Sequence, residues 1–166
     1  MITIMSAENP MQLFLMRHGE ASFDAPSDKE RMLTDTGRYT SRMMAKWLTK
    51  MTTRVDLVIV SPYVRAQQTW QEVSKHLAEP RHIVTLDDIT PNADPKFAVD
   101  AILAYAEQYK ADTVLVIAHM PILGYMVSEF VYGIEPPLFA TSGIAHIDKH
   151  LELASLVAMQ NPTQLA

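Results

Sequence analysis

Short apolar runs that stop abruptly at polar residues are the feature of this sequence that most constrains its fold. The clearest run covers residues 113–118 (TVLVIA) and is followed directly by His119. Residues 12–16 (QLFLM) and 55–60 (VDLVIV) form two similar runs. Runs of this length and composition are typical of strands that are buried on both faces of a sheet. The sequence therefore predicts central strands that end where reactive side chains begin.

Helical patterns separate these runs. Apolar residues recur at a spacing of three to four between residues 35 and 51, and Thr34 or Asp35 can cap this helix. Further helices are predicted at residues 62–77, 95–109 and 122–131, two of them with proline in the first turn. Shorter strands are predicted at residues 82–86, 144–150 and 151–159, the last two as a hairpin.

The alternation of strands with helices predicts an α/β three-layer sandwich, with a mostly parallel central sheet flanked by helices. In such folds ligands bind beyond the carboxyl ends of the strands. A chain of 166 residues has room for one ordinary domain, so we expect a single domain over residues 1–166, with residues 1–10 as a flexible extension.

Composition excludes several classes of function. A formal net charge of -5 argues against electrostatic binding of nucleic acid. The sequence has no uninterrupted apolar run of about 18 residues and no pattern of a secretory signal at its start, so no membrane association is predicted. The absence of cysteine fits a reducing compartment, and we expect a cytoplasmic protein.

Residues 17–19 (RHG) directly follow the first predicted strand. Arg17 is suited to bidentate binding of an anion, and His18 has a ring nitrogen that is partly neutral at pH 7 and can act as a nucleophile. Gly19 lets the backbone come close to a ligand. An isolated RHG triplet is explained equally well as a solvated turn, so its meaning depends on the other motifs.

Two further motifs follow the other central strands. Arg65 lies in residues 61–66 (SPYVRA), where the start of a helix and the guanidinium can both favour an anion. His119 follows the most apolar strand, and the backbone amide of Met120 beside it is an available donor, whereas Pro121 has none. Taken alone, Arg65 is better explained as a surface side chain and His119 as a core histidine. Parallel strands bring all these motifs to one edge of the sheet, which favours a shared site.

These motifs, in this order, resemble the histidine phosphatase (phosphoglycerate mutase-like) superfamily over nearly the whole chain. The matching segments are residues 15–20 (LMRHGE), 33–37 (LTDTG), 61–66 (SPYVRA) and 119–121 (HMP). Within the superfamily, chain length, motif order and residues 136–142 (PPLFATS) are most similar to the SixA phosphohistidine phosphatases. The interval between Arg65 of the third segment and His119 of the fourth is short. It leaves no room for a large cap insert.

The resemblance implies a role for each site residue. His18 matches the nucleophile that becomes phosphorylated, Arg17 and Arg65 match the arginines that bind phosphate oxygens, and His119 matches the second histidine of the pocket. Phosphoryl transfer needs in-line placement and positive charge around the equatorial oxygens, which these residues and the amide of Met120 can supply. We therefore expect no cofactor and no metal.

Many superfamily members also use an acidic residue as proton donor to the leaving oxygen. No position matches with certainty, and the candidates are equally well explained as solvated charges: Glu20, Glu72, Asp87 and Asp88. Imidazole, with a pKa near 6.5, needs little help to depart, so an uncertain acid favours phosphohistidine as the substrate.

The leading prediction is a protein phosphohistidine phosphatase that works through a phosphohistidine intermediate. The resemblance implies a signalling partner, either the histidine phosphotransfer domain of a hybrid sensor kinase or a phosphocarrier protein. Two alternatives are a small-molecule phosphomonoesterase or mutase of the same superfamily, and a module that recognises phosphate without catalysis.

Overall fold

The computed structural model describes residues 10–165 and contains one mixed sheet with strand order β3-β2-β4-β1-β5-β6. The extension expected at residues 1–10 lies, except for Pro10, outside the described residues. The strands are β1 (Met11–Arg17), β2 (Leu57–Val60), β3 (His82–Thr85), β4 (Thr113–Ala118), β5 (Ile144–His150) and β6 (Leu153–Gln160). The first four pair in parallel, while β5 pairs antiparallel with β1 and with β6. The predicted terminal hairpin is therefore present.

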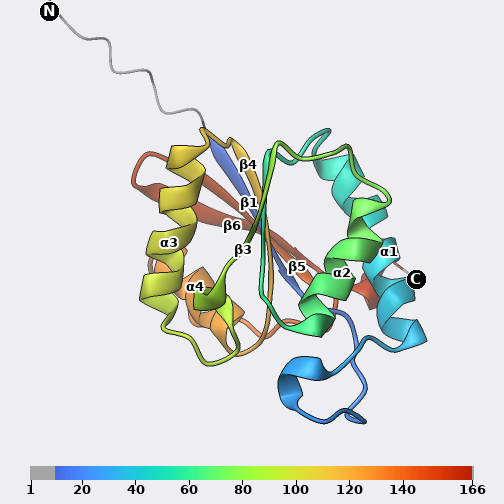
Figure 1. Cartoon of the computed structure of the whole chain (residues 1–166). Helices are drawn as coiled ribbons and strands as arrows, with labels where there is room; N and C mark the ends of the chain where they lie inside the picture. The colour runs from blue at the N-terminus through green and yellow to red at the C-terminus, as the bar shows by residue number, and fades with distance from the viewer. Residues whose placement is uncertain (1–9, 166) are drawn as a thin grey trace, which may run out of the picture.

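Helices cover both faces of the sheet and make a three-layer sandwich, as Figure 1 shows: α1 and α2 lie on one side, and α3 and α4 on the other. Their bounds are α1 (Asp35–Met51), α2 (Val64–Ser74), α3 (Pro95–Gln108) and α4 (Ile122–Phe130). Between Arg65 and His119 the chain forms only the rest of α2, β3, a 3-10 turn, α3 and β4, so no cap domain is inserted there.

Two apolar clusters hold the layers together. Leu13 and Leu15 of β1 belong to the cluster under α3 and α4, whereas Phe14 and Met16 belong to the cluster under α1 and α2. Alternate side chains of a strand point to opposite faces, so a strand that is apolar at every position is buried on both. The carboxyl end of β1, where Arg17 and His18 follow one another, is therefore held by neighbouring strands on both sides.

Local boundaries follow capping chemistry. Thr34 caps α1, because its hydroxyl accepts from the amide of Gly37 at 3.0 Å. The helix predicted to start at Pro62 instead begins at Val64. Tyr63 keeps an extended backbone, and its amide donates to Ser61 Oγ at 3.3 Å, which closes the turn before the helix starts. Within residues 10–165, no helix has the length and apolar character needed to span a membrane.

Candidate active site

The ends of three adjacent strands bring the predicted site residues together. The amide of His18 donates to the carbonyl of Ala118 at 3.0 Å, which continues the β1–β4 pairing by one residue. The amide of Ser61 donates to Ile117 O at 3.0 Å and continues the β2–β4 pairing in the same way. His18, Ser61 and the residue after Ala118, His119, therefore meet at the carboxyl edge of the sheet.

Two hydrogen bonds fix the tautomer of His18. Its Nδ1 lies 2.7 Å from Gly19 O, and since a carbonyl only accepts, Nδ1 carries the ring proton. On the other side of the ring, Arg65 Nε donates to His18 Nε2 at 3.1 Å. Both contacts require the same neutral imidazole, with the lone pair on Nε2. The backbone carbonyl of Gly19 is thus the group that sets the tautomer of the ring.

Burial keeps His18 neutral. Its side chain is only 6% exposed, and burial lowers its pKa to about 4. The hydrogen bond to Gly19 works in the opposite direction, while the positive charges of Arg65, Arg17 and Arg31 lower the pKa further. The ring is therefore in its nucleophilic form at neutral pH.

Arg65 connects His18 to the loop that precedes α1. Its NH1 donates to the backbone carbonyl of Asp28 at 2.6 Å, and its NH2 pairs with the Asp28 carboxylate at 3.2 Å. Burial raises the pKa of Asp28, but the hydrogen bonds and charges of Arg31 and Arg65 outweigh it and lower the pKa. The Asp28 carboxylate thus accepts from NH2 of Arg65, a donor that a bound phosphate could otherwise use.

Arg17 is held at the opposite side of the site. Its NH1 donates to the carbonyl of Phe139 at 2.7 Å, in the segment that precedes β5. Burial, together with the nearby charges of Arg65 and Arg31, lowers the pKa of Arg17. Because an arginine stays charged in proteins, the positive charges of Arg17, Arg31 and Arg65 lie close together and favour the binding of an anion.

His119 packs beside His18, with ring centroids 5.2 Å apart, and is 1% exposed. Its Nε2 shares a hydrogen bond of 2.6 Å with Ser61 Oγ. Burial, and then the charges of His18, Arg65 and Arg17, lowers its pKa to about 2, so this ring is neutral as well. Ser61 orients the ring from behind.

Two buried side-chain nitrogens in the described part of the chain have no hydrogen-bond partner: Arg17 Nε and His119 Nδ1. Buried polar groups are rarely left without a partner, because each such group costs about 1–3 kcal/mol. Both nitrogens belong to residues that the sequence assigns to the site. An oxyanion seated against His18 is the kind of ligand that would satisfy them.

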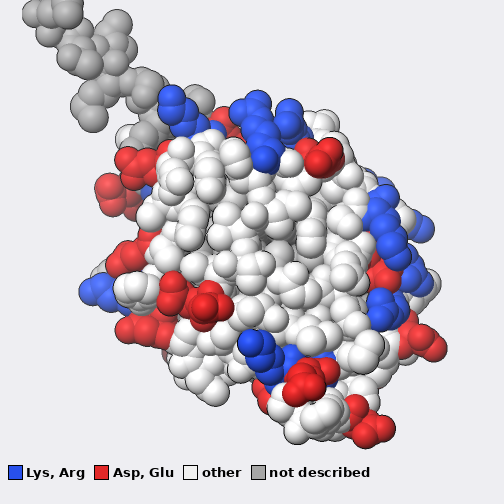
Figure 2. Space-filling model, in the orientation of Figure 1, with Lys and Arg blue, Asp and Glu red and all other residues white. Residues whose placement is uncertain are grey.

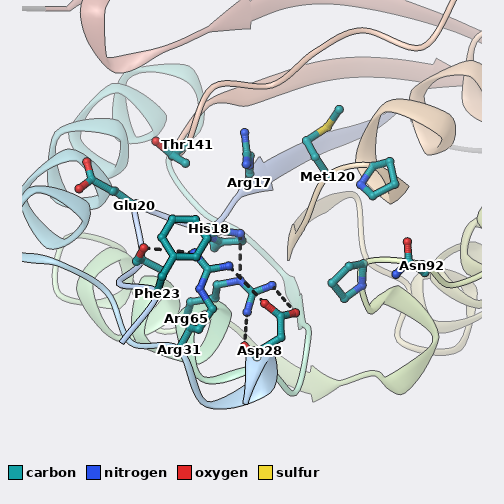
Figure 3. A pocket seen from close by; sticks show the side chains of 13 residues that line it. Arg17, His18, Glu20, Phe23, Asp28, Arg31, Arg65, Asn92, Met120 and Thr141 are labelled. Carbon is teal, nitrogen blue, oxygen red and sulfur yellow. Dashed lines mark hydrogen bonds and ion pairs between the residues drawn. The ribbon is translucent and has the colours of Figure 1, made fainter. Parts of the chain in front are cut away.

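A cavity of about 430 Å³ opens over these residues. Its lining includes Arg17, His18, Glu20, Ala21, Phe23, Asp28, Arg31, Arg65, Pro91, Asn92, Met120, Pro121 and Thr141. Figure 3 shows Arg17 and Met120 on one side of His18, and Arg65 and Asp28 on the other. His119 is not among these lining residues, but its ring centroid lies only 5.2 Å from that of His18.

Charges of both signs gather around this end of the molecule. Figure 2 shows Lys and Arg atoms next to Asp and Glu atoms at the lower edge, which in Figure 1 is the edge where β1 and β4 end. The lining itself contains three guanidinium groups against two carboxylates. A cavity with this balance favours an anion.

Of the four candidate proton donors, only Glu20 lines the cavity. Glu72 is instead a buried ion-pair centre, with Arg38, Arg42 and Lys75 2.9–3.2 Å from its oxygens. Burial raises its pKa, but these three partners outweigh that effect and lower the pKa to about 2. It joins α1 to α2 and is ionised, so it is unsuited to donate a proton. The other two candidates, at residues 87–88, lie on a 3-10 turn after β3 and outside the lining.

The sequence reading missed three residues of the site: Phe23, Asp28 and Arg31. All three lie in residues 21–33, whose sequence has no helical or strand period and is typical of an exposed connection. Asp28 and Arg31 form an i,i+3 ion pair of 3.2 Å. Their spacing in the sequence is the one signal that could have indicated an ordered turn in this segment. Among the residues described, no group of three His, Asp or Glu side chains comes together as a metal site.

A buried neutral histidine next to arginines and a second neutral histidine is suited to phosphoryl transfer. Comparison with known proteins agrees. The model of the histidine phosphatase superfamily (branch 1) matches residues 13–90. Phosphohistidine phosphatase SixA of Escherichia coli (strain K12) is 43% identical over 137 residues, 82% of this chain and 84% of the relative. The chain therefore belongs to the histidine phosphatase superfamily.

Two further relatives support this assignment. The phosphohistidine phosphatase SixA homolog of Haemophilus influenzae is 34% identical over 136 residues, 77% of this chain and 81% of the relative. The structure of the protein histidine phosphatase SixA complexed with tungstate superimposes with a TM-score of 0.88 at 38% identity, over 94% of this chain and 100% of the other. The resemblance read from the motifs and the α/β three-layer fold are both confirmed.

Proposed function

We propose that this protein removes phosphate from phosphohistidine in a partner protein, with His18 as the nucleophile. The observation that carries the proposal is the fixed tautomer of His18, because its Nε2 has a lone pair while Nδ1 is bonded to Gly19 O at 2.7 Å. A neutral, oriented imidazole is the form that can attack phosphorus. The relatives named phosphohistidine phosphatase support this choice of substrate.

The reaction consists of two displacements at one phosphorus. In the first, Nε2 of His18 forms a bond to phosphorus while the P–N bond of the substrate breaks, and the substrate imidazole leaves with a proton taken from solvent. In the second, water attacks the phosphorus of phosphorylated His18, the P–Nε2 bond breaks, and inorganic phosphate is released. Each step needs in-line placement more than any further chemistry from the protein.

The charged and polar groups around His18 stabilise the phosphoryl group in this proposal. Arg17 and Arg65 bind its oxygens, and Arg17 Nε and His119 Nδ1 gain the partners that they lack. The amide of Met120, on the lining of the cavity, is a further donor. The tungstate complex of the related SixA supports an oxyanion ligand for a protein of this fold.

The carboxylates of the cavity support a leaving group that needs no strong acid. Asp28 is held ionised by two arginines, and Glu20 is an exposed side chain at the edge. General acid catalysis contributes about 10²- to 10⁴-fold to reactions that need it. Imidazole departs readily without such help, whereas an alkoxide does not.

The partner in this proposal is a phosphohistidine-bearing signalling protein, either the histidine phosphotransfer domain of a hybrid sensor kinase or a phosphocarrier protein. Without an inserted cap between Arg65 and His119, a side chain on a folded protein can reach the cavity. We place this activity in the cytoplasm, since a chain without cysteine fits a reducing compartment.

A comparison of leaving groups tests the proposal. The purified protein is given a histidine phosphotransfer domain phosphorylated on histidine and, separately, phosphoglycerate and phosphoserine. We expect kcat/KM to be about 100-fold or more higher for the phosphohistidine protein, because the phosphomonoesters lack an acid for their alkoxide. Equal or faster turnover of the phosphomonoesters would make the protein a small-molecule phosphatase. Tight phosphate binding without any turnover would make it a recognition module.

A further inference from the structure

Phe23 is a large apolar side chain that the fold leaves in solvent. It is 86% exposed, yet it lies on the lining of the same cavity as His18. Apart from His18, it is the aromatic residue of that lining. Exposed aromatic side chains at the edge of a cavity are typical of sites where a ligand or partner provides the missing contact.

Arg31 holds Phe23 in place. Its guanidinium carbon lies 4.0 Å from the centroid of the Phe23 ring. Three hydrogen bonds fix the guanidinium: Nε donates to Ser22 O at 2.9 Å, NH2 to Ala21 O at 3.2 Å, and NH1 to the Asp28 carboxylate at 3.2 Å. One face of the ring is therefore covered by a fixed cation, while most of the ring stays accessible.

The loop that carries Phe23 is closed at its base, so the ring has a defined position. Ala21 and Leu33 form an antiparallel bridge, and the amide of Ser22 donates to Met32 O at 2.8 Å. The amide of Leu33 also donates to the side chain of Gln68 in α2 at 2.7 Å. A loop fixed in this way can present a contact surface without losing conformational entropy when the substrate binds.

In-line attack determines where the leaving group lies. His18 is at the base of the cavity, 6% exposed, so a leaving group opposite Nε2 points outward to the mouth. Phe23 lines the same cavity, and Figure 3 shows its ring next to the guanidinium of Arg31. We propose that Phe23 is a specificity-determining residue that packs against the imidazole ring of the phosphohistidine substrate. This inference rests on the proposed function, because it names the contact made by that leaving group.

Two small substrates test the contact between Phe23 and the substrate imidazole. Both contain a P–N bond, but only one contains a ring. Free phosphohistidine carries the imidazole, whereas phosphoramidate does not. We expect Phe23→Ala to lower kcat/KM for free phosphohistidine about 3- to 10-fold, the loss that corresponds to one aromatic pair. The kcat/KM for phosphoramidate should stay within about 2-fold.

Two variants serve as controls. Phe23→Trp keeps an aromatic surface at the same place and should retain most of the activity on phosphohistidine. Phe97→Ala removes a ring that is 59% exposed on α3 and outside the cavity lining, and it should change neither substrate. A thermal melt of Phe23→Ala should match that of the wild type, because the ring is in solvent.

The outcomes distinguish this inference from the proposed function. If the wild type hydrolyses both substrates and Phe23→Ala slows both equally, or neither, the ring makes no contact with the imidazole and the inference is wrong, while the proposed function stands. If Phe23→Ala slows only a phosphorylated partner protein and not free phosphohistidine, Phe23 contacts the protein surface instead. If the wild type hydrolyses neither P–N substrate and no phosphohistidine protein, both fail together.

Discussion

Arg65 Nε donates to His18 Nε2 at 3.1 Å, so the guanidinium suited to bind phosphate also orients the nitrogen that acts as the nucleophile in the proposed reaction. When a phosphoryl group is transferred to Nε2, this nitrogen no longer accepts a hydrogen bond, and Arg65 Nε becomes free to donate to a phosphate oxygen. In this proposal the same guanidinium first orients Nε2 of His18 and then stabilises the phosphoryl group bonded to it.

The pH profile should report the low pKa of His18. Burial lowers this pKa to about 4, so the ring stays neutral and nucleophilic as the pH falls from 8 to about 5. We expect the imidazole resonances of His18 to titrate with a midpoint near 4 in an NMR titration. A midpoint near 6.5, the ordinary value for histidine, would show that the ring is solvated and not held as described.

The pKa of His119 has a consequence for stability. The unfolded chain binds a proton on this histidine below about pH 6.5, whereas burial lowers the pKa in the folded protein to about 2. The unfolded state therefore binds more protons as the pH falls below 6.5, and the free energy of unfolding decreases. His18 acts in the same direction.

Replacing His119 should reduce this loss. Between pH 7 and pH 5, the free energy of unfolding of His119→Gln should fall by about 1–2 kcal/mol less than that of the wild type. Urea denaturation at both pH values measures the difference, and His150→Gln, a change at an exposed strand end, is the control. Identical pH dependence in the wild type and His119→Gln would contradict the assignment.

Asp28 should compete with phosphate for Arg65. In Asp28→Asn the backbone carbonyl still accepts from Arg65 NH1, as it does at 2.6 Å in the wild type, but the negative charge is lost. Because the side chain of Asp28 is 58% exposed, the ion pair contributes little, and we expect tungstate to bind up to about 5-fold more tightly. Calorimetry measures the affinity. Weaker binding would mean that the carboxylate positions Arg65 instead of competing for it.

Gly37 allows α1 to approach the loop that follows His18. A Cβ at Gly37 would overlap the backbone of Glu20, and a Cβ at Gly19 would lie 2.5 Å from Gly37 O. Backbone atoms cannot yield as a flexible side chain can, so Gly37→Ala should lower the free energy of unfolding by about 1–3 kcal/mol and reduce activity. The neighbouring exposed Thr36→Ala is the control, and equal stability of the two variants would contradict this packing.

Much of the fold could be predicted from the sequence because apolar periodicity determines burial. The runs at β1, β2 and β4 are apolar at nearly every position, and in the structure they are the central parallel strands. Their ends identified His18, Arg65 and His119, since parallel strands end at one edge. The start of α2 was misjudged, because Pro62 suits a helix start as well as the turn that it occupies.

The loop at the cavity could not be predicted. Residues 21–33 have no hydrophobic period, and their shape depends on contacts with distant residues, such as the Arg65 hydrogen bond to Asp28 O. The cation–π contact between Arg31 and Phe23 likewise leaves no pattern in the sequence. Such contacts are tertiary, so local rules do not determine them.

The central claim is that phosphate passes through His18. A rapid-quench experiment with a radiolabelled phosphohistidine protein, stopped in alkaline denaturant and followed by mass spectrometry, tests it most directly. We predict an alkali-stable, acid-labile phosphate on His18 in the wild type and in His150→Ala, and neither phosphoenzyme nor turnover in His18→Ala. Label on another residue, or continued turnover by His18→Ala, would contradict the account.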